Sequence, residues 1–452
     1  MSRTAESVVE RAFPERARLE ELAAFVLKEA RGRGASAAET GVSFGAGLSV
    51  TVRKGEVDTL EFNRDRGLSV TVYFGHSKGS ASTSDWSEPA VREAVAAACS
   101  IARLTAEDPC AGLADAERMA TEVPDLDLFH PWPLTAEDAI GIARACEGAA
   151  LEADQRITNS EGGSVSSHQG VTVYGNSHGF VGGYTGTRHS VSCAVIGAHG
   201  NSMQRDYWYT IARDASDMEA AEAVGRHAAQ RTVRRLDGRR LKTRQAPVLF
   251  AAEIASGVLG HLVAAVRGGK LYRNASFLVD HLGKRIFPEF VTIRERPHLK
   301  KALGSAAFDA EGVATTDREL VGNGVLNGYV LDSYSARRLG METTGNAGGV
   351  HNLVIEPGSY DAVGLLQQMD TGLLVTEVMG QGINYVTGDY SRGAAGFWVE
   401  NGEIQYPVEE ITIAGNLADM FMQLAEVGTD VDSRGNIHTG SLLIGNMMIA
   451  GE

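Results

Sequence analysis

The stretch from residue 247 to residue 290 changes its hydrophobic period within a few positions, and the C-terminal half of the chain is organised around it. Residues 247–252 are mostly apolar, as in a short buried strand. Immediately afterwards Ile254, Val258, Leu262 and Val266 recur every four residues, which is the spacing of one buried helix face. Many hydrolases carry catalytic groups where a strand runs directly into a helix, so this helix is the first place to look for chemistry.

Two side chains on this predicted helix could carry chemistry, Glu253 and His261. Eight residues along a helix is about 12 Å, and the two side chains point about 80° apart, so one metal ion cannot reach both. A helical zinc pair needs a second ligand three or four residues away. The residues at those distances from His261 have no ligand atoms: Gly257, Val258, Ala264 and Ala265. We interpret His261 as a histidine at the rim of a buried face with a local hydrogen bond.

The first half of the chain repeats one order of elements twice. Apolar periodicity predicts helices at 19–31, 88–104, 136–153 and 217–236, with alternating, glycine-punctuated segments between them. In the first unit these segments predict five strands at 42–44, 48–53, 56–63, 67–74 and 77–83, separated by glycine turns. Residues 105–133 gather five of the chain's prolines and glycines without periodicity, which is typical of a surface linker.

The second half is predicted to be rich in β-structure around the central helix. Strands are expected at 328–334, 352–355, 373–379, 395–401 and 411–414, and one further helix at 417–427. The fold class is therefore α+β, with two N-terminal helix-meander-helix units followed by a β-rich C-terminal domain. We place the domain boundaries at residues 1–112, 113–240 and 241–452.

Composition excludes several classes of function. A formal charge of −15 argues against direct binding to nucleic acid or to an anionic membrane. No run of 18 apolar residues occurs, and the first 25 residues hold acidic side chains but no apolar core of a signal peptide, so we expect a cytoplasmic protein without a membrane segment. The four cysteines lack a CxxC pair and all precede residue 200, which argues for reduced thiols and leaves no thiol for a C-terminal metal site.

A loop at residues 344–352, TGNAGGVHN, is the candidate for ligand contact. Glycine and asparagine permit positive φ angles, which can leave backbone N–H groups free for a ligand. The predicted lining residues are Asn346, Gly348, Gly349, His351 and Asn352. The alternative is a plain connecting loop.

Seven segments, in this order, give the chain a resemblance to a known family. They are VTVRKGEVDTLEFNRDRGLSVTV (50–72), KGSASTSD (78–85), IARLTAEDPCAG (101–112), LVDHLGKRIF (278–287), YSARRLGMETTGNAGG (334–349), WVENGEIQYP (398–407) and IAGN (413–416). On these segments the chain resembles the TldD/PmbA family, in particular its PmbA (TldE) branch. The resemblance implies a cytoplasmic metallopeptidase complex of a TldD-type and a PmbA/TldE-type subunit, which processes leader peptides and degrades unfolded peptides or antitoxins.

The resemblance also implies which subunit this chain is. In the TldD branch a helix carries HExxxH, and a cysteine near the C-terminus completes a zinc site. Our alignment places Gly260 and Ala265 at the two histidine positions and His261 at the glutamate position, and no cysteine follows Cys193. We therefore expect no catalytic residue and no metal in this chain, zinc in a TldD-type partner, and a heterodimer, with a homodimer possible when the chain is alone.

Two other functions stay open at this point. The chain could be an enzyme in its own right, with a metal site assembled from distant histidines such as His261, His281, His298, His351 and His438. Alternatively, it could be a binding or regulatory protein that acts indirectly on DNA gyrase or on RNA regulators.

Overall fold

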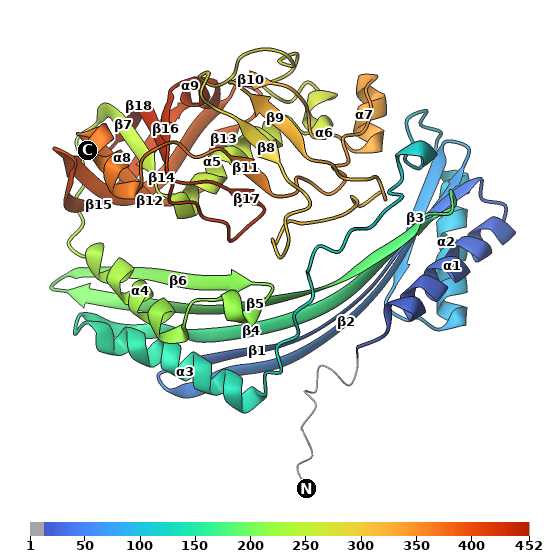
Figure 1. The fold of residues 1–452 in the computed structure, drawn as a ribbon, viewed down its shortest axis with the longest axis horizontal. Helices are drawn as coiled ribbons and strands as arrows, with labels where there is room; N and C mark the ends of the chain where they lie inside the picture. Colours follow the sequence, from blue (N-terminus) through green and yellow to red (C-terminus); the bar gives the residue numbers. More distant parts are fainter. Residues whose placement is uncertain (1–12, 452) are drawn as a thin grey trace, which may run out of the picture.

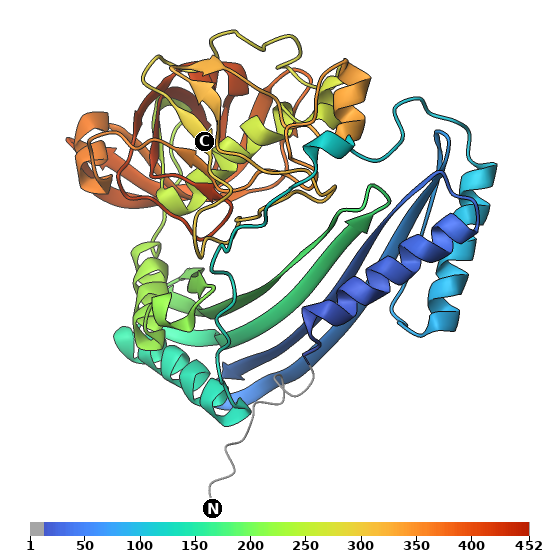
Figure 2. The ribbon, with the colours of Figure 1, turned by 45° about the vertical axis from the view of Figure 1, so that its right-hand side comes forward.

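The computed structural model describes residues 13–451 and has two layers (Figures 1 and 2). One layer is a long curved sheet, which carries helices on its convex face. The other layer is the C-terminal domain, which lies over the concave face of that sheet. This arrangement confirms the α+β class. The prediction that the first 25 residues hold no signal peptide falls in part on residues 1–12, outside the described residues.

The N-terminal sheet has six strands in the order β3-β2-β1-β4-β5-β6. Strands β1 and β4 pair antiparallel from Glu39 opposite Asn176 to Val52 opposite Gly163. The two meanders predicted from the sequence are therefore parts of one continuous sheet. The strands are β1 (Ala37–Arg53), β2 (Glu56–Phe74), β3 (Ser77–Thr83), β4 (Ile157–Asn176), β5 (Val181–His199) and β6 (Ser202–Ala212).

The first meander has three strands, of which β1 and β2 are long, where the sequence predicts five short ones. The expected turns at residues 45–47 and 66–67 lie inside β1 and β2. Gly47 shows why a glycine can stand within a strand. A Cβ atom there would lie 1.9 Å from Nδ1 of His168 on the neighbouring strand, so the glycine makes room for that side chain rather than turning the chain.

Two pairs of helices cover the convex face (Figure 2). Alternate residues of β1 point toward them. Val42, Phe44 and Ala46 pack against the first pair, and Leu48, Val50 and Val52 pack against the second. The first pair is α1 (Arg16–Gly32) and α2 (Glu88–Leu104), and the second is α3 (Ala136–Ala153) and α4 (Ala221–Arg234).

The linker after α2 lies along the C-terminal domain. It contains only a short 3-10 turn at Ala116–Arg118, as its lack of periodicity predicts. Arg337 donates hydrogen bonds to the carbonyl oxygens of Cys110 and Gly112, and Tyr334 donates one to Asp108 at 2.8 Å. Another 3-10 turn, Ala215–Asp217, precedes α4.

The C-terminal domain combines two sheets. In the larger sheet, strands follow the order β12-β7-β18-β15-β14, and pairing of β12 with β14 closes this path on itself. The larger sheet contains β7 (Arg244–Phe250), β12 (Gly372–Met379), β13 (Ile383–Asn384), β14 (Asp389–Glu400), β15 (Glu403–Asn416), β16 (Leu424–Val427) and β18 (Leu442–Ala450). The smaller sheet contains β8 (Ile293–Glu295), β9 (Arg318–Gly322), β10 (Val325–Leu326), β11 (Leu353–Ile355) and β17 (Ile437–His438).

Five helices accompany these sheets. They are α5 (Ala252–Ala265), α6 (Gly268–Leu271), α7 (Ser333–Leu339), α8 (Ala362–Met369) and α9 (Leu417–Met422). The central helix is confirmed as α5. The strand predicted at 328–334 is wrong, because α7 begins there with Asp332 as its N-cap, and α8 is absent from the prediction. The helix predicted at 417–427 ends at Met422, and residues 424–427 instead pair with β18.

Within residues 13–451, no helix combines the length and the apolar character that crossing a membrane requires.

Candidate functional site

Helix α5 passes through the core of the C-terminal domain, and its His261 side chain is part-buried. Nδ1 of His261 lies 3.0 Å from the hydroxyl oxygen of Tyr385, and the ring contacts the rings of Tyr385 and Tyr390. Burial, followed by the positive charge of Arg392, lowers the pKa of His261 to about 4. His261 therefore has the local hydrogen bond expected from the sequence and is neutral at pH 7.

The low pKa predicts how His261 titrates. Its imidazole resonances should show a midpoint near pH 4, against about 6.5 for an exposed histidine. Because the folded-state pKa is lowered, this side chain contributes stability above pH 6.5, and the contribution is lost as the pH falls from 6.5 to 4. Proton NMR of the wild type, with His261→Gln to assign the signal, measures the midpoint. A midpoint near 6.5 would contradict the burial of this ring.

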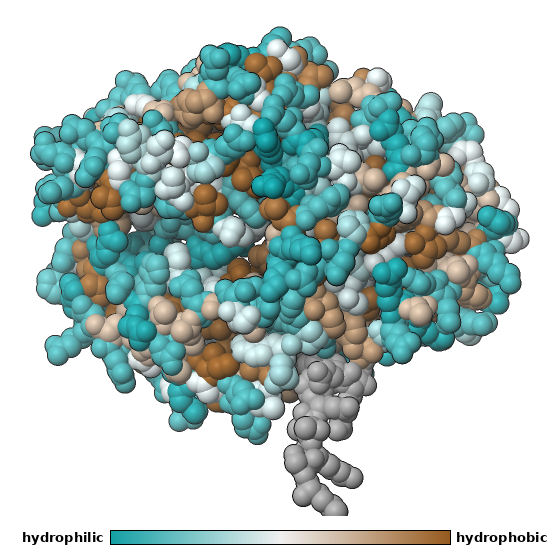
Figure 3. Space-filling view, in the orientation of Figure 1, coloured by the Kyte–Doolittle hydropathy of each residue, from teal (hydrophilic) through white to brown (hydrophobic). Residues whose placement is uncertain are grey.

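A cavity of about 530 Å³ lies between the N-terminal sheet and the C-terminal domain. Tyr174 and Tyr184 line it from the sheet, and Gly348, Gly349 and His351 line it from the opposite side. The space-filling view shows the molecular surface hollowed between these two layers (Figure 3). Three of the five predicted lining residues therefore stand in the wall of one cavity.

The other two predicted residues, Asn346 and Asn352, do not line this cavity. Both side chains are buried, and their hydrogen bonds fix the loop from the side that faces away from the cavity. The Asn346 amide donates to Glu295 at 2.7 Å and to the carbonyl oxygen of Gly349 at 3.0 Å. The Asn352 amide donates to Ser305 and to the carbonyl oxygen of Arg296, while its oxygen accepts from the N–H of Gly304.

Glu295 fixes the same loop through its two carboxylate oxygens. One oxygen accepts from the Asn346 amide and, at 2.6 Å, from the N–H of His351, and the other accepts from Nε of Arg318 at 2.7 Å. Glu295 is only 2 % exposed. A buried carboxylate with these three partners holds the backbone that carries Gly348 and Gly349 in place.

Acidic groups next to the cavity were not among the predicted site residues. Asp309 lines the cavity and is buried, and it accepts hydrogen bonds from the N–H groups of Glu311, Val313 and Ala347. Burial raises the pKa of Asp309, and burial raises that of nearby Glu311 to about 7. In the sequence, the glycine of the segment DAEG (309–312) indicates the turn that Asp309 caps. No spacing of residues in the sequence indicates that Asp309 lies close to residue 347.

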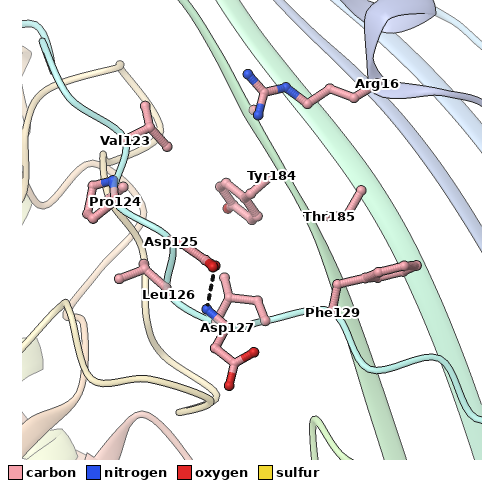
Figure 4. A pocket seen from close by; sticks show the side chains of 12 residues that line it. Arg16, Val123, Pro124, Asp125, Leu126, Asp127, Phe129, Tyr184 and Thr185 are labelled. Carbon is pink, nitrogen blue, oxygen red and sulfur yellow. Dashed lines mark hydrogen bonds between the residues drawn. The ribbon is translucent and has the colours of Figure 1, made fainter.

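A second cavity, of about 380 Å³, lies beside the linker (Figure 4). The linker residues Val123 and Pro124 form one side, and Tyr184 of β5, Arg16 of α1 and the linker residue Phe129 lie on the other. Asp125 accepts a hydrogen bond from the N–H of Asp127 at 2.9 Å, which shapes the linker at this point. Tyr184 lines both cavities.

Three family models match successive parts of the chain. The PmbA/TldA metallopeptidase domain 1 matches residues 38–102, the central domain matches 129–236 and the C-terminal domain matches 243–451. The chain belongs to the PmbA/TldD metallopeptidase family. Among its curated relatives, metalloprotease PmbA of Escherichia coli O157:H7 is 52% identical over 98% of this chain and 99% of its own length. The metalloprotease PmbA homolog of Haemophilus influenzae is 50% identical over 96% of each chain.

Solved structures of the PmbA/TldD fold are also similar. A putative modulator of DNA gyrase from Bacteroides thetaiotaomicron has a TM-score of 0.91 and 29% identity, covering 96% of this chain and 99% of its own. TldE from Thermococcus kodakarensis has a TM-score of 0.80 over 96% of this chain and 100% of its own, and at 22% identity this likeness shows the fold alone.

The PmbA/TldD family is one of metallopeptidases, but the side chains on α5 do not fit a metal ion. Gly260 and Ala265 have no donor atoms, and Nδ1 of His261 faces the Tyr385 hydroxyl. Within residues 13–451, no three His, Cys, Asp or Glu side chains lie close enough together to hold a metal.

The remaining candidate histidines have separate local partners. His281 contacts the carbonyl oxygen of Val279, His298 the hydroxyl of Thr315, and His438 the carbonyl oxygen of Gly435. Nε2 of His351 is buried and has no hydrogen-bond partner in the described residues.

Proposed function

We propose that this chain is the non-catalytic, PmbA/TldE-type subunit of a cytoplasmic metallopeptidase complex. In this proposal a TldD-type subunit binds the zinc ion and cleaves the peptide bond. This chain pairs with that subunit and shapes the cleft that admits unfolded peptides, such as leader peptides or antitoxins. Its own α5 takes no part in the chemistry.

The observation that carries the proposal is the chemistry of α5. A peptidase zinc site needs three protein ligands, an open position for water and a nearby base. The aligned positions offer an unsubstituted glycine, an alanine methyl group and a part-buried imidazole that is neutral at pH 7. Conversion of this helix into a zinc site would require at least two new ligand side chains.

The cavity beside residues 347–351 supports the part of the proposal that concerns the substrate. Its walls combine tyrosine rings with backbone at Gly348 and Gly349, where no side chain covers the peptide groups. Such walls can contact an extended peptide through its main chain, which gives affinity that depends little on the sequence. The aromatic rings add apolar contact area.

The decisive experiment compares this chain alone with an equimolar mixture of this chain and its TldD-type partner. We expect no stoichiometric zinc and no cleavage of an unfolded peptide by the lone chain. In the mixture we expect about one zinc ion per pair and peptide cleavage. Metal is measured by atomic emission and cleavage by mass spectrometry.

Two controls make this comparison specific. The partner alone, at the same zinc content, shows how much activity this chain adds. A mixture treated with chelator should be inert and should regain cleavage when zinc is restored. Stoichiometric zinc and cleavage in the lone chain, abolished by His261→Ala, would overturn the proposal and assign the chemistry to this subunit.

A further inference from the structure

Two short segments of the C-terminal domain carry several cations and no acidic side chain. Residues 267–273, RGGKLYR, hold three cations, and residues 333–341, SYSARRLGM, hold two. The first segment contains α6 and the second contains α7, and the two helices contact each other. Figure 1 shows both helices at the end of the C-terminal domain that lies near β3. Because the whole chain has a formal charge of −15, these segments depart from the charge of the rest.

Two tyrosine rings hold three cations at this end of the molecule. Cζ of Arg273 lies 5.0 Å and Cζ of Arg338 lies 5.3 Å from the centre of the Tyr272 ring. The Tyr272 and Tyr334 rings meet edge to face, with their centres 6.0 Å apart. Nζ of Lys78, which belongs to β3, lies 5.8 Å from the centre of the Tyr334 ring. A cation over a ring is attracted by the π electrons, so the rings fix where these side chains lie.

A fourth cation connects this group to α5. Nζ of Lys270 lies 4.2 Å from the centre of the Tyr385 ring, and the Tyr385 hydroxyl lies 3.0 Å from Nδ1 of His261. Arg273 follows Lys270 by three residues at the end of α6, so the two side chains are neighbours on the surface of this turn. The cation–tyrosine patch, as we define it, consists of Lys78, Lys270, Tyr272, Arg273, Tyr334 and Arg338.

The four cations of the patch have no ion pair and no side-chain hydrogen bond within residues 13–451. Three of the four are exposed. One carboxylate touches the patch, since Asp108 accepts a hydrogen bond from the Tyr334 hydroxyl at 2.8 Å. Hydrogen bonds from the N–H of Cys110 and from Tyr334 lower the pKa of Asp108, which is therefore ionised at pH 7. Four positive charges against one negative charge leave the patch cationic.

Other acidic residues near the patch do not pair with it. Glu107 and Asp280, the nearest along the chain, are exposed and form no ion pair within residues 13–451. Asp115 and Glu342 pair with arginines that lie outside the patch. Asp332 is the N-cap of α7, where its side chain accepts a backbone N–H. The cations of the patch are therefore available to an anionic ligand.

The tyrosine rings hold the cations without using their donors. The rings accept no hydrogen bond from Arg273 or Arg338, so the N–H groups of both guanidinium ions remain unused by the described chain. A guanidinium ion donates two parallel hydrogen bonds to a carboxylate or a phosphate. Because the rings already restrict these side chains, less conformational entropy is lost when an anion binds.

The surroundings favour the carboxylates of a peptide over the phosphates of a nucleic acid. Single-stranded nucleic acid binds where aromatic faces are free to stack on bases. Here Tyr272, Tyr334 and Tyr385 each have a cation over the ring. The formal charge of −15 also repels a polyanion before it reaches the patch. A short peptide with a few acidic side chains meets less of this repulsion.

We propose that the cation–tyrosine patch binds the aspartate and glutamate side chains of an unfolded peptide. Arg273 and Arg338 donate paired hydrogen bonds to carboxylates, and Lys78 and Lys270 add positive charge from β3 and α6. Peptides with several acidic residues therefore bind more tightly than neutral peptides of the same length. This inference deepens the proposed function, because it names the peptides that this subunit selects, and it rests on that function for their role as substrates.

Fluorescence anisotropy on the full chain alone tests the binding, because no cleavage is needed. The probes are two labelled peptides of about twelve residues, in which about five glutamates of one peptide are glutamines in the other. At low salt we expect the dissociation constant of the glutamate peptide to be at least tenfold below that of the glutamine peptide. The difference should shrink at about 0.5 M salt, because salt screens exposed charges.

Charge-matched variants locate the binding. R273E/R338E should raise the dissociation constant of the glutamate peptide at least tenfold. The control R226E/K242E changes the net charge equally at two exposed cations, on α4 and just before β7, at the opposite end of the molecule (Figure 1). The control should change the dissociation constant by less than about twofold. Tyr272→Leu keeps every charge but removes the ring, and should raise the dissociation constant about fivefold. Circular dichroism confirms that each variant is folded.

Three results would overturn the inference. The first is equal affinity of the wild type for the two peptides. The second is equal weakening by R273E/R338E and R226E/K242E, since only the net charge would then matter. The third is a single-stranded oligonucleotide of about twelve nucleotides that binds more tightly than the glutamate peptide and is lost in R273E/R338E, which would assign the patch to nucleic acid. All three leave the proposed function standing, because that function fails only if the lone chain holds zinc and cleaves peptide.

Discussion

Replacing Glu295 with alanine is expected to lower the free energy of unfolding by about 3–5 kcal/mol, the cost of removing one partner from a buried charge pair. Glu295 is 2 % exposed and holds the Arg318 guanidinium, whose Nη2 atom is already buried without a hydrogen-bond partner among residues 13–451. The substitution leaves that cation uncompensated. It also removes the acceptor of the Asn346 amide and of the His351 N–H group.

A neighbouring glutamate provides the control for this experiment. Glu319 lies on β9 and pairs with Arg294 at 3.3 Å, with both side chains more than one third exposed. Exposed pairs contribute about 0–1 kcal/mol, so Glu319→Ala should change stability by less than about 1 kcal/mol. Urea titration followed by tryptophan fluorescence gives both values. Equal losses for the two variants would mean that Glu295 does not hold the loop.

Valine at both Gly348 and Gly349 is expected to reduce peptide turnover by the reconstituted complex at least tenfold. The two glycines have φ angles of 103° and 134°, which a β-branched residue adopts only with strain of about 1–3 kcal/mol each. The loop must therefore shift. In addition, two branched side chains enter a part of the cavity wall that consists of backbone alone in the wild type. Turnover is measured with unfolded peptide at equal concentrations of the two subunits.

Gly380→Val separates the effect on the cavity from backbone strain in general. Gly380 has a φ of 80° and lies outside the cavity wall, and a Cβ atom at this position would have no atom of the described residues within 4 Å apart from its chain neighbours. Its substitution should leave both turnover and subunit pairing intact. If G348V/G349V also keeps full turnover, then residues 348 and 349 do not contact the substrate.

The sequence predicts best the helices whose ends are marked by capping residues and whose apolar residues recur regularly. Helix α2 has the predicted bounds, because Ser87 and Pro89 mark its start and its apolar stripe is regular. Helix α3 begins at a reciprocal Thr135–Asp138 cap that can be read directly from the residues. The short helices α7 and α8 escape prediction, since seven or eight residues are too few to show a helical period.

Features that depend on contacts between distant strands could not be predicted. Gly47 is typical of a turn until His168 is known to lie across from it. The cavity also depends on contacts between distant segments. The sequence predicts the loop with Gly348, Gly349 and His351. Tyr174 and Tyr184 lie opposite this loop only because the sheet curves beneath the C-terminal domain. The composition of the loop likewise does not show that the Asn346 and Asn352 side chains point away from the cavity.

The joining of β1 to β4 governs how the protein acquires its structure during synthesis. Strand β1 leaves the ribosome long before β4. Glu39 of β1 can therefore pair with Asn176 of β4 only after the intervening chain has been synthesised. At roughly 5–20 residues per second, the edge of β1 that later pairs with β4 stays unpaired for about 5 to 30 seconds. During that time the nascent chain exposes strand edges on both sides of the β1–β2 hairpin. A chaperone that shields the first hundred residues should therefore raise the yield of folded protein more than one that acts on the finished chain.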